Sequence, residues 1–228
     1  PVKVWDRGQP RKDVLNFILT NMRARRDQEG DFNALIGACQ VGARNLINLM
    51  KKYGKEMVQD CIAELLDMAE AHMRKLIAEV PDGTYSGTAI LEDAGHGFGD
   101  FEITATVTIK GDGCHIEIAS PPQIPYFINS YEGNSHSGVY LGLMMFAQLP
   151  PPYNEGLYRC VTTDMGPKGT LCNAQEPAPQ TSVDILGGGR AALVAANKSL
   201  GLALAEDEID YFVDSIQNKT RKKSCLED

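Results

Sequence analysis

The sequence lacks the patterns that mark several common classes of protein. None of its six cysteines belongs to a C-x-x-C pair, and structural zinc sites need such close pairs so that two thiolates can reach one ion. No apolar run approaches the roughly 20 residues that span a bilayer, so we expect no membrane segment. The net charge is −8, which argues against a nucleic-acid partner because phosphate binding needs clustered Lys and Arg.

Targeting and pairing signals are missing as well. The first six residues lack the basic and then apolar layout of a signal peptide. Because the cysteines are scattered, we expect no structural disulfide and a reducing, cytoplasmic setting. The chain starts with Pro1 in place of Met, from which we expect a processed or truncated piece of a longer protein.

Between residues 10 and 80 the apolar residues follow a helical period. Gly54 separates two long segments, and a glycine there supplies the left-handed residue that ends a helix. We therefore predict an antiparallel helical hairpin whose two stripes pack as core, with a shorter helix ahead of it near Val14 and Ile18. The stripes are Leu35, Cys39, Leu46, Ile47 and Met50 before the glycine, and Val58, Cys61, Ile62, Leu65, Leu66, Ala69, Met73, Leu76, Ile77 and Val80 after it.

Strand patterns follow a turn at residues 81–84. Apolar and polar residues alternate in 102–110, and residues 85–91 and 114–118 also have the composition of strands. A Gly-Asp-Gly sequence just before residue 114 has the chemistry of a hairpin turn. We predict a further strand at 157–162.

A polar, turn-rich stretch at residues 129–136 leads into an apolar segment at 138–149 that we predict to be a helix. Ser135 or Asn134 would cap this helix. The free backbone N–H groups at a helix start favour an anion such as a carboxylate or a phosphate. The alternative is that these polar residues only satisfy the start of the helix.

The histidines do not form a metal-binding pattern. His72, His96, His115 and His136 are dispersed, and none has a second histidine or a cysteine three or four residues away. We therefore expect no metal site within this chain, and the residues alone identify no catalytic group. The Gly-rich residues 95–100 lead into a strand and not into a helix, which favours a flexible loop over a phosphate-binding loop.

A series of short motifs occurs in order through residues 5–179. They are Asp6-Arg-Gly8, Gln40-Val-Gly-Ala-Arg-Asn-Leu46, Tyr53-Gly54, Met73-Arg74, Pro81-Asp-Gly-Thr-Tyr85, Asn154-Glu-Gly156 and Pro167-Lys-Gly-Thr-Leu-Cys-Asn173. With these motifs the region resembles the hydantoinase B/oxoprolinase family, and within it most of all the metal-containing alpha subunit of acetone carboxylase.

The resemblance implies a subunit of an ATP-dependent ketone carboxylase of the acetone type, or of a hydantoinase-type hydrolase. It implies ATP and a divalent metal, manganese, in the full complex, with an ATP-using hydantoinase A-like subunit and a small third subunit as partners. The family's metal motifs lie upstream, so we expect this chain to supply walls of the substrate pocket and to be inactive alone. By family analogy, the substrate-binding candidates are Asn129, Glu132, Asn134 and His136.

The end of the chain carries a second resemblance. Residues 180–213, with a triple glycine at 187–189, resemble a short segment of phosphoribosylformylglycinamidine synthase, whose ATP- and substrate-binding motifs do not follow here. No Lys-Ser/Thr pair follows the glycines, which favours a tight turn over a phosphate cradle. This change at Pro179 predicts a composite or chimeric chain. A non-catalytic assembly module, an inert composite and, with less support, a part of the purine enzyme remain alternatives.

Together these patterns predict an α+β fold. The N-terminal helical hairpin is expected beside an antiparallel or mixed sheet, with a short C-terminal β-turn-α-α tail. The expected domains are residues 1–179, helical to residue 80 and β-rich from 81 to 179, and a small α/β tail at 180–228.

Overall fold

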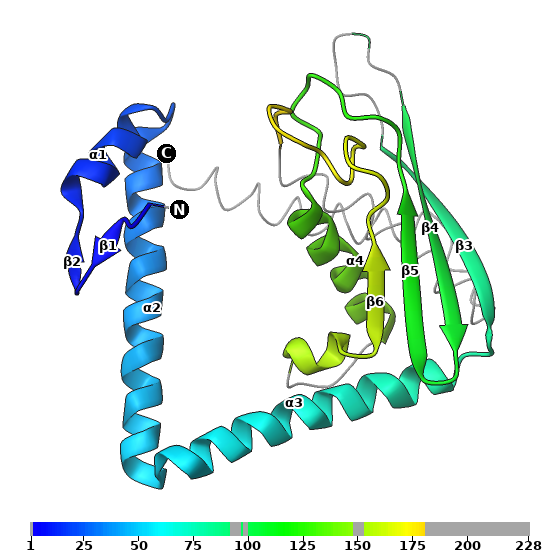
Figure 1. Ribbon diagram of the computed structural model, residues 1–228, viewed down its shortest axis with the longest axis horizontal. Coiled ribbons are helices and arrows are strands. Elements are labelled where there is room, and N and C mark those ends of the chain that lie inside the picture. The colour runs from blue at the N-terminus through cyan, green and yellow to red at the C-terminus, as the bar shows by residue number, and fades with distance from the viewer. Residues whose placement is uncertain (1, 92–96, 98–99, 148–152, 181–228) are drawn as a thin grey trace, which may run out of the picture. The chain divides into compact units, whose positions relative to one another are not determined.

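The computed structural model describes residues 2–91, 97, 100–147 and 153–180 (Figure 1). These residues belong to two compact units, which divide between Ala63 and Glu64. The predicted C-terminal tail from residue 181 onward lies outside the described residues, as does most of the Gly-rich loop at 95–100. In the described part of the chain, no helix is long and apolar enough to cross a membrane.

The first unit begins with a small β-hairpin. β1 (Trp5–Asp6) pairs antiparallel with β2 (Gln9–Pro10). The type I′ form of a two-residue turn needs positive φ at both positions, and Arg7 (47°) and Gly8 (79°) supply it. α1 (Lys12–Thr20) follows and is the short helix predicted ahead of the long ones.

α2 (Arg25–Tyr53) and α3 (Lys55–Ala78) are the two long helices predicted on either side of Gly54. Gly54 has a φ of 88° and its N–H donates to the carbonyl of Met50 at 2.9 Å, so the predicted helix end is confirmed. The stripe of α2 differs from the prediction of a packed core: none of its 29 residues is buried, and Leu35 is 65% exposed. Periodicity shows which face of a helix is apolar but not what covers that face.

The second unit is built on a four-stranded sheet with the order β3-β4-β5-β6. β3 (Gly83–Leu91), β4 (Phe101–Lys110) and β5 (Gly113–Ala119) are antiparallel neighbours, as the alternating pattern predicted (Figure 1). β6 (Val161–Asp164) pairs parallel with β5, which makes the sheet mixed. Parallel neighbours need a long crossover connection, and the segment between β5 and β6 provides it. This segment includes α4 (Glu132–Ala147).

The predicted strand at 157–162 is wrong in its first residues. A 3-10 turn, η1 (Glu155–Tyr158), occupies this place, and β6 begins only at Val161. The Asn154 side chain accepts a hydrogen bond from the N–H of Gly156 at 2.9 Å, and this local bond starts the turn in place of a strand.

One face of the sheet carries the core of the second unit. β4 and β5 bury alternate side chains on this face, and the later turns of α3 and the middle of α4 belong to the same core cluster. Its members include Ala69, Met73 and Ile77 of α3, Ile103, Ala105 and Val107 of β4, Ile116 of β5, and Val139 and Leu143 of α4. The predicted α+β class is confirmed, and for this part of α3 the predicted core stripe is also correct.

Candidate functional site

Asn129 anchors the loop that leads into α4. Its side chain is fully buried, and its amide N–H groups donate to the carbonyls of Ile124 (2.7 Å), Tyr126 (2.5 Å) and Pro179 (2.7 Å). Its amide oxygen accepts from the N–H of Ile124 at 2.9 Å. Because its polar atoms bond to the protein's own backbone, Asn129 shapes the loop and leaves no atom toward a bound molecule.

α4 begins at Glu132, six residues before the predicted start at Gly138. The carbonyl of Tyr131 accepts from the N–H groups of Asn134 (2.9 Å) and Ser135 (3.1 Å), so both residues lie inside the first turn and not ahead of it. The hydroxyl of Ser135 donates to that of Ser130 at 3.0 Å. The polar residues that suggested a turn are therefore the opening turn of the helix itself.

His136 connects α4 with β6. Its Nδ1 lies 2.6 Å from the hydroxyl of Thr163, and its Nε2 lies 3.8 Å from a carboxylate oxygen of Glu132, one turn earlier on the helix. The His136 side chain is 28% exposed and that of Glu132 is 60% exposed, so solvent reaches the carboxylate end of this hydroxyl–imidazole–carboxylate chain. The ring of Tyr140 stacks beside the imidazole, with centroids 6.3 Å apart.

A second group of a threonine, a histidine and a glutamate lies on the other face of the sheet. The hydroxyl of Thr162 is 2.7 Å from Nδ1 of His115, whose Nε2 lies 3.7 Å from Glu117. Adjacent residues of a strand point to opposite faces, so Thr162 and Thr163 of β6 serve the two histidines separately. The group that contains Thr163 faces α4, and the group that contains Thr162 lies on the face opposite the core.

Two tyrosines extend the stack that starts at His136. The rings of Tyr140 and Tyr158 lie 4.0 Å apart between centroids, nearly parallel. The Tyr158 hydroxyl donates to the sulfur of Met144 at 2.7 Å. Burial, and next the neighbouring Tyr140, raise the pKa of Tyr158, so its hydroxyl keeps its proton and remains a donor.

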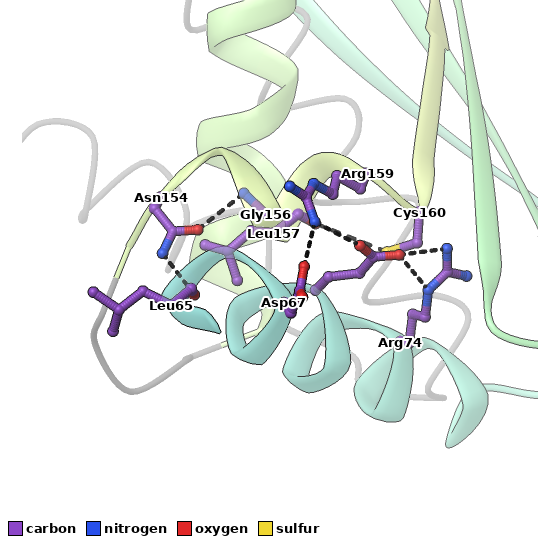
Figure 2. A network of polar contacts seen from close by, with 9 residues as sticks. Leu65, Asp67, Arg74, Asn154, Gly156, Leu157, Arg159 and Cys160 are labelled. Atoms are coloured by element: carbon purple, nitrogen blue, oxygen red, sulfur yellow. Dashed lines mark hydrogen bonds and ion pairs between the residues drawn. The ribbon is translucent and has the colours of Figure 1, made fainter. Parts of the chain in front are cut away.

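A network of charged residues joins α3 to the segment before β6 (Figure 2). The Arg159 guanidinium lies 2.7 Å from Asp67 and 3.3 Å from Glu70. Arg74 pairs with Glu70 at 2.7 Å and with Asp112 of the β4–β5 turn at 3.2 Å. The hydrogen bond from Arg74, and next that from Arg159, hold the pKa of Glu70 below its ordinary value.

The same segment contacts the backbone of α3 directly. The Asn154 side chain donates to the carbonyl of Leu65 at 3.0 Å (Figure 2). Gly156 lies against the neighbouring carbonyl, and a Cβ at this position would overlap the oxygen of Leu66. These two residues begin and end the Asn-Glu-Gly motif quoted above, so that motif has a structural role in holding η1 on α3.

Of the four predicted site residues, three gather at the start of α4: Glu132 and His136 one turn apart, with Asn134 between them. Asn129 lies in the preceding loop and is enclosed. Sequence reasoning missed Thr163, because its pairing with His136 depends on how β6 packs against α4. It also missed Tyr140, although a ring four residues after a histidine lies on the same face of a helix.

The described residues do not fit a metal ion. Among them, no group of three or more His, Cys, Asp or Glu side chains could hold one. The pair of His136 and Glu132 falls short of the three or four protein ligands that zinc sites use.

Comparison with protein families matches residues 1–199 to the model described as hydantoinase B/oxoprolinase. This match continues 20 residues past the boundary predicted at Pro179. Among curated proteins, the beta subunit of the Pseudomonas jessenii caprolactamase is 68% identical over 182 residues, covering 80% of this chain and 31% of that protein. The B subunit of the putative D-/L-hydantoinase of Pseudomonas sp. (strain NS671) is 32% identical over 194 residues, covering 78% and 32%.

Solved structures resemble the chain as well. The crystal structure of the ATP-dependent caprolactamase from Pseudomonas jessenii has a TM-score of 0.79 and 62% identity, over 87% of this chain and 35% of that one. The nucleotide-free structure of acetone carboxylase has a TM-score of 0.68 at 17% identity, over 84% and 28%, which is a likeness of fold alone. The chain thus spans about a third of the length of the relatives it matches.

Proposed function

The chain belongs to the hydantoinase B/oxoprolinase family, and from this membership we propose that it forms part of the β-type subunit of an ATP-dependent enzyme that opens cyclic amides. The observation that carries the proposal is the 68% identity over 182 residues with the beta subunit of caprolactamase. Identity at this level supports a shared chemistry. The 17% identity with acetone carboxylase does not, so ketone carboxylation has less support than lactam opening.

In this proposal, ATP and a partner subunit complete the full enzyme. The caprolactamase of known structure is described as ATP-dependent, and the related proteins are named as subunits, which supports an ATP-using hydantoinase A-like partner. The small third subunit came from the carboxylase resemblance and has correspondingly less support. A divalent metal such as manganese would be held elsewhere in the enzyme, since the described residues offer no ligand set for it.

We assign substrate contact to the start of α4. A cyclic amide presents one N–H donor and one carbonyl acceptor. The exposed carboxylate of Glu132 can accept from the N–H, and the imidazole of His136 can donate to the carbonyl. Thr163 fixes the orientation of that imidazole through Nδ1 at 2.6 Å, and the enclosed Asn129 holds the loop before the helix.

A chimera tests this assignment. Residues 2–180 of this chain replace the matching region in the beta subunit of the Pseudomonas jessenii caprolactamase, which is then assembled with its natural partner. ATP-dependent opening of caprolactam is measured for the chimera and for its Glu132→Gln and His136→Asn variants. We expect each variant to raise the KM for caprolactam by about tenfold, the effect of losing roughly 1.4 kcal/mol of binding.

The matched control is His115→Asn. His115 has the same kind of threonine and glutamate neighbours on the opposite face of the sheet, so its loss should leave KM unchanged. Equal effects of the two histidine changes would contradict the assignment of the site to α4. An inactive chimera, where the natural caprolactamase works in parallel, would contradict the proposed function itself.

A further inference from the structure

The two ring nitrogens of His136 have neighbours of different kinds. Nδ1 lies 2.6 Å from the hydroxyl oxygen of Thr163, and Nε2 lies 3.8 Å from a carboxylate oxygen of Glu132. A neutral imidazole carries one proton, so one nitrogen is a donor and the other is an acceptor. The neighbours therefore decide which nitrogen keeps the proton.

The carboxylate neighbour favours a proton on Nε2. An ionised carboxylate can only accept hydrogen bonds, and its charge attracts the positive end of an N–H group. A bare Nε2 would turn its lone pair toward that charge, which is unfavourable. At 3.8 Å, Nε2 and the Glu132 oxygen are too far apart for a direct hydrogen bond, so the Nε2 proton is available to another acceptor.

The distance at the hydroxyl end agrees with a proton on Nε2. In that arrangement Nδ1 is the acceptor, and the Thr163 hydroxyl donates to it. Hydroxyl donors form the shorter hydrogen bonds, at about 2.5–3.0 Å to oxygen, whereas N–H donors to oxygen stay at about 2.7–3.2 Å. The separation of 2.6 Å between Thr163 and Nδ1 lies within the first range and below the second.

Packing keeps the imidazole in this orientation. The ring of Tyr140 lies beside it, with centroids 6.3 Å apart, and stacks in turn on the ring of Tyr158 at 4.0 Å. The His136 side chain is 28% exposed, so a flip of its ring, which would take both nitrogens away from their partners, meets neighbouring atoms.

We propose that Thr163, through Nδ1, holds the proton of neutral His136 on Nε2, so that His136 and Glu132 form a donor–acceptor pair for a cis amide. A small ring holds its amide cis, with the N–H and the carbonyl on the same side, whereas open-chain amides are trans. A donor and an acceptor side by side can therefore bind both groups of a lactam, and no proton has to move. The binding of a lactam rests on the function proposed above, whereas the position of the proton does not.

The first test locates the proton directly, in the full 228-residue chain labelled with ¹⁵N in its histidine rings. Long-range ¹H–¹⁵N spectra at the high-pH plateau of a titration distinguish a nitrogen that carries a proton from a bare one. His136→Asn identifies the signals. We expect Nε2 of His136 in the range of protonated nitrogens and Nδ1 in the range of bare ones. The reverse assignment, or equal shifts for the two nitrogens, would overturn the proposal.

Adjacent threonines of β6 supply the matched variants. Thr163→Val keeps the shape of the side chain and removes the hydroxyl that donates to Nδ1 of His136. Thr162→Val makes the same change at His115 on the opposite face, where the hydroxyl lies 2.7 Å from Nδ1. Each variant should shift Nδ1 of its own histidine and leave the other histidine unchanged, which also shows that the sheet is intact. Thr163→Ser should keep the parent shift, and an unchanged His136 spectrum in Thr163→Val would refute the role of Thr163.

The second test concerns the cis amide and uses the chimera described above. Thr163→Val should raise the KM for caprolactam by about fivefold, the effect of weakening one hydrogen bond, and Thr163→Ser should restore it. As competing inhibitors, δ-valerolactam, a cis amide, should bind at least about tenfold more tightly than N-propylacetamide, a trans amide with as many carbon atoms. Glu132→Gln should reduce that difference.

The two tests fail in different ways. Equal inhibition by the two amides would overturn the match to a cis amide. An inactive chimera would contradict the proposed function, and the spectra, which need no partner, ATP or lactam, would still decide the position of the proton.

Discussion

At the scale of single residues, the structure depends on a few positions whose chemistry admits no substitute. Gly156 lies so close to the backbone of α3 that the need for glycine is steric, and Asn129 has no polar atom left for a ligand. Gly156 belongs to one of the motifs that resemble the family, and Asn129 is one of the predicted substrate-binding residues. Their role in the structure is to fix the segments on which the candidate site depends.

Gly156→Ala should destabilise the second unit by about 3 kcal/mol, because the added methyl group overlaps the carbonyl of Leu66 and forces η1 away from α3. The chain's one tryptophan, Trp5, lies in the first unit and would not report this change. Hydrogen exchange of the β5 and β6 amides is the suitable measurement. Gly133→Ala is the control, since open space surrounds that position and alanine suits a helix; equal protection in the two variants would refute the steric account.

At the scale of elements, the network of Asp67, Glu70, Arg74, Asp112 and Arg159 joins a helix, a hairpin turn and the start of a strand. These side chains are partly or largely exposed, so each pair contributes little by itself. The hydrogen bond from Arg74, and next that from Arg159, lower the pKa of Glu70. That shift makes the stability of the second unit depend on pH.

The sign of this dependence follows from the direction of the shift. The pKa of Glu70 is lower in the folded chain than its ordinary value of 4.5, so the stabilisation is present above pH 4.5 and is lost as the pH falls below it. Glu70→Gln should therefore flatten the fall of the melting temperature between about pH 5 and pH 3. Glu64→Gln, at an exposed position of the same helix, should keep the slope of the parent chain, and a parallel slope for Glu70→Gln would rule out this contribution.

The sequence predicted elements better than the contacts between them. Alternation located β4 and β5 because one face of each strand is buried, and Gly54 ended α2 as expected. The start of α4 was placed six residues late, since polar helix-opening turns and loops have similar compositions. The pairing of Arg159 with Asp67 joins residues 92 positions apart, and no local pattern encodes it.

The candidate site was predictable only in part for the same reason. Glu132 and His136 are one turn apart on a helix, so their proximity follows from spacing alone. Thr163 reaches His136 because β6 pairs in parallel with β5 in one register, with Thr163 beside Ile116. That register depends on the whole second unit and could not be derived from the motif.

At the scale of the whole molecule, the family match over residues 1–199 covers the first compact unit and most of the second. In our proposed function, the second unit positions the start of α4 toward a cyclic amide. The chain spans about a third of the length of the relatives that it matches.

The most direct measurement of the central claim is the product formed by the unsubstituted chimera with its natural partner, ATP, and either caprolactam or acetone with bicarbonate. The account predicts opening of the caprolactam ring that stops when ATP is omitted, and no carboxylation of acetone. Carboxylation of acetone without ring opening would contradict it. That result would support the carboxylase activity implied by the resemblance of its sequence motifs.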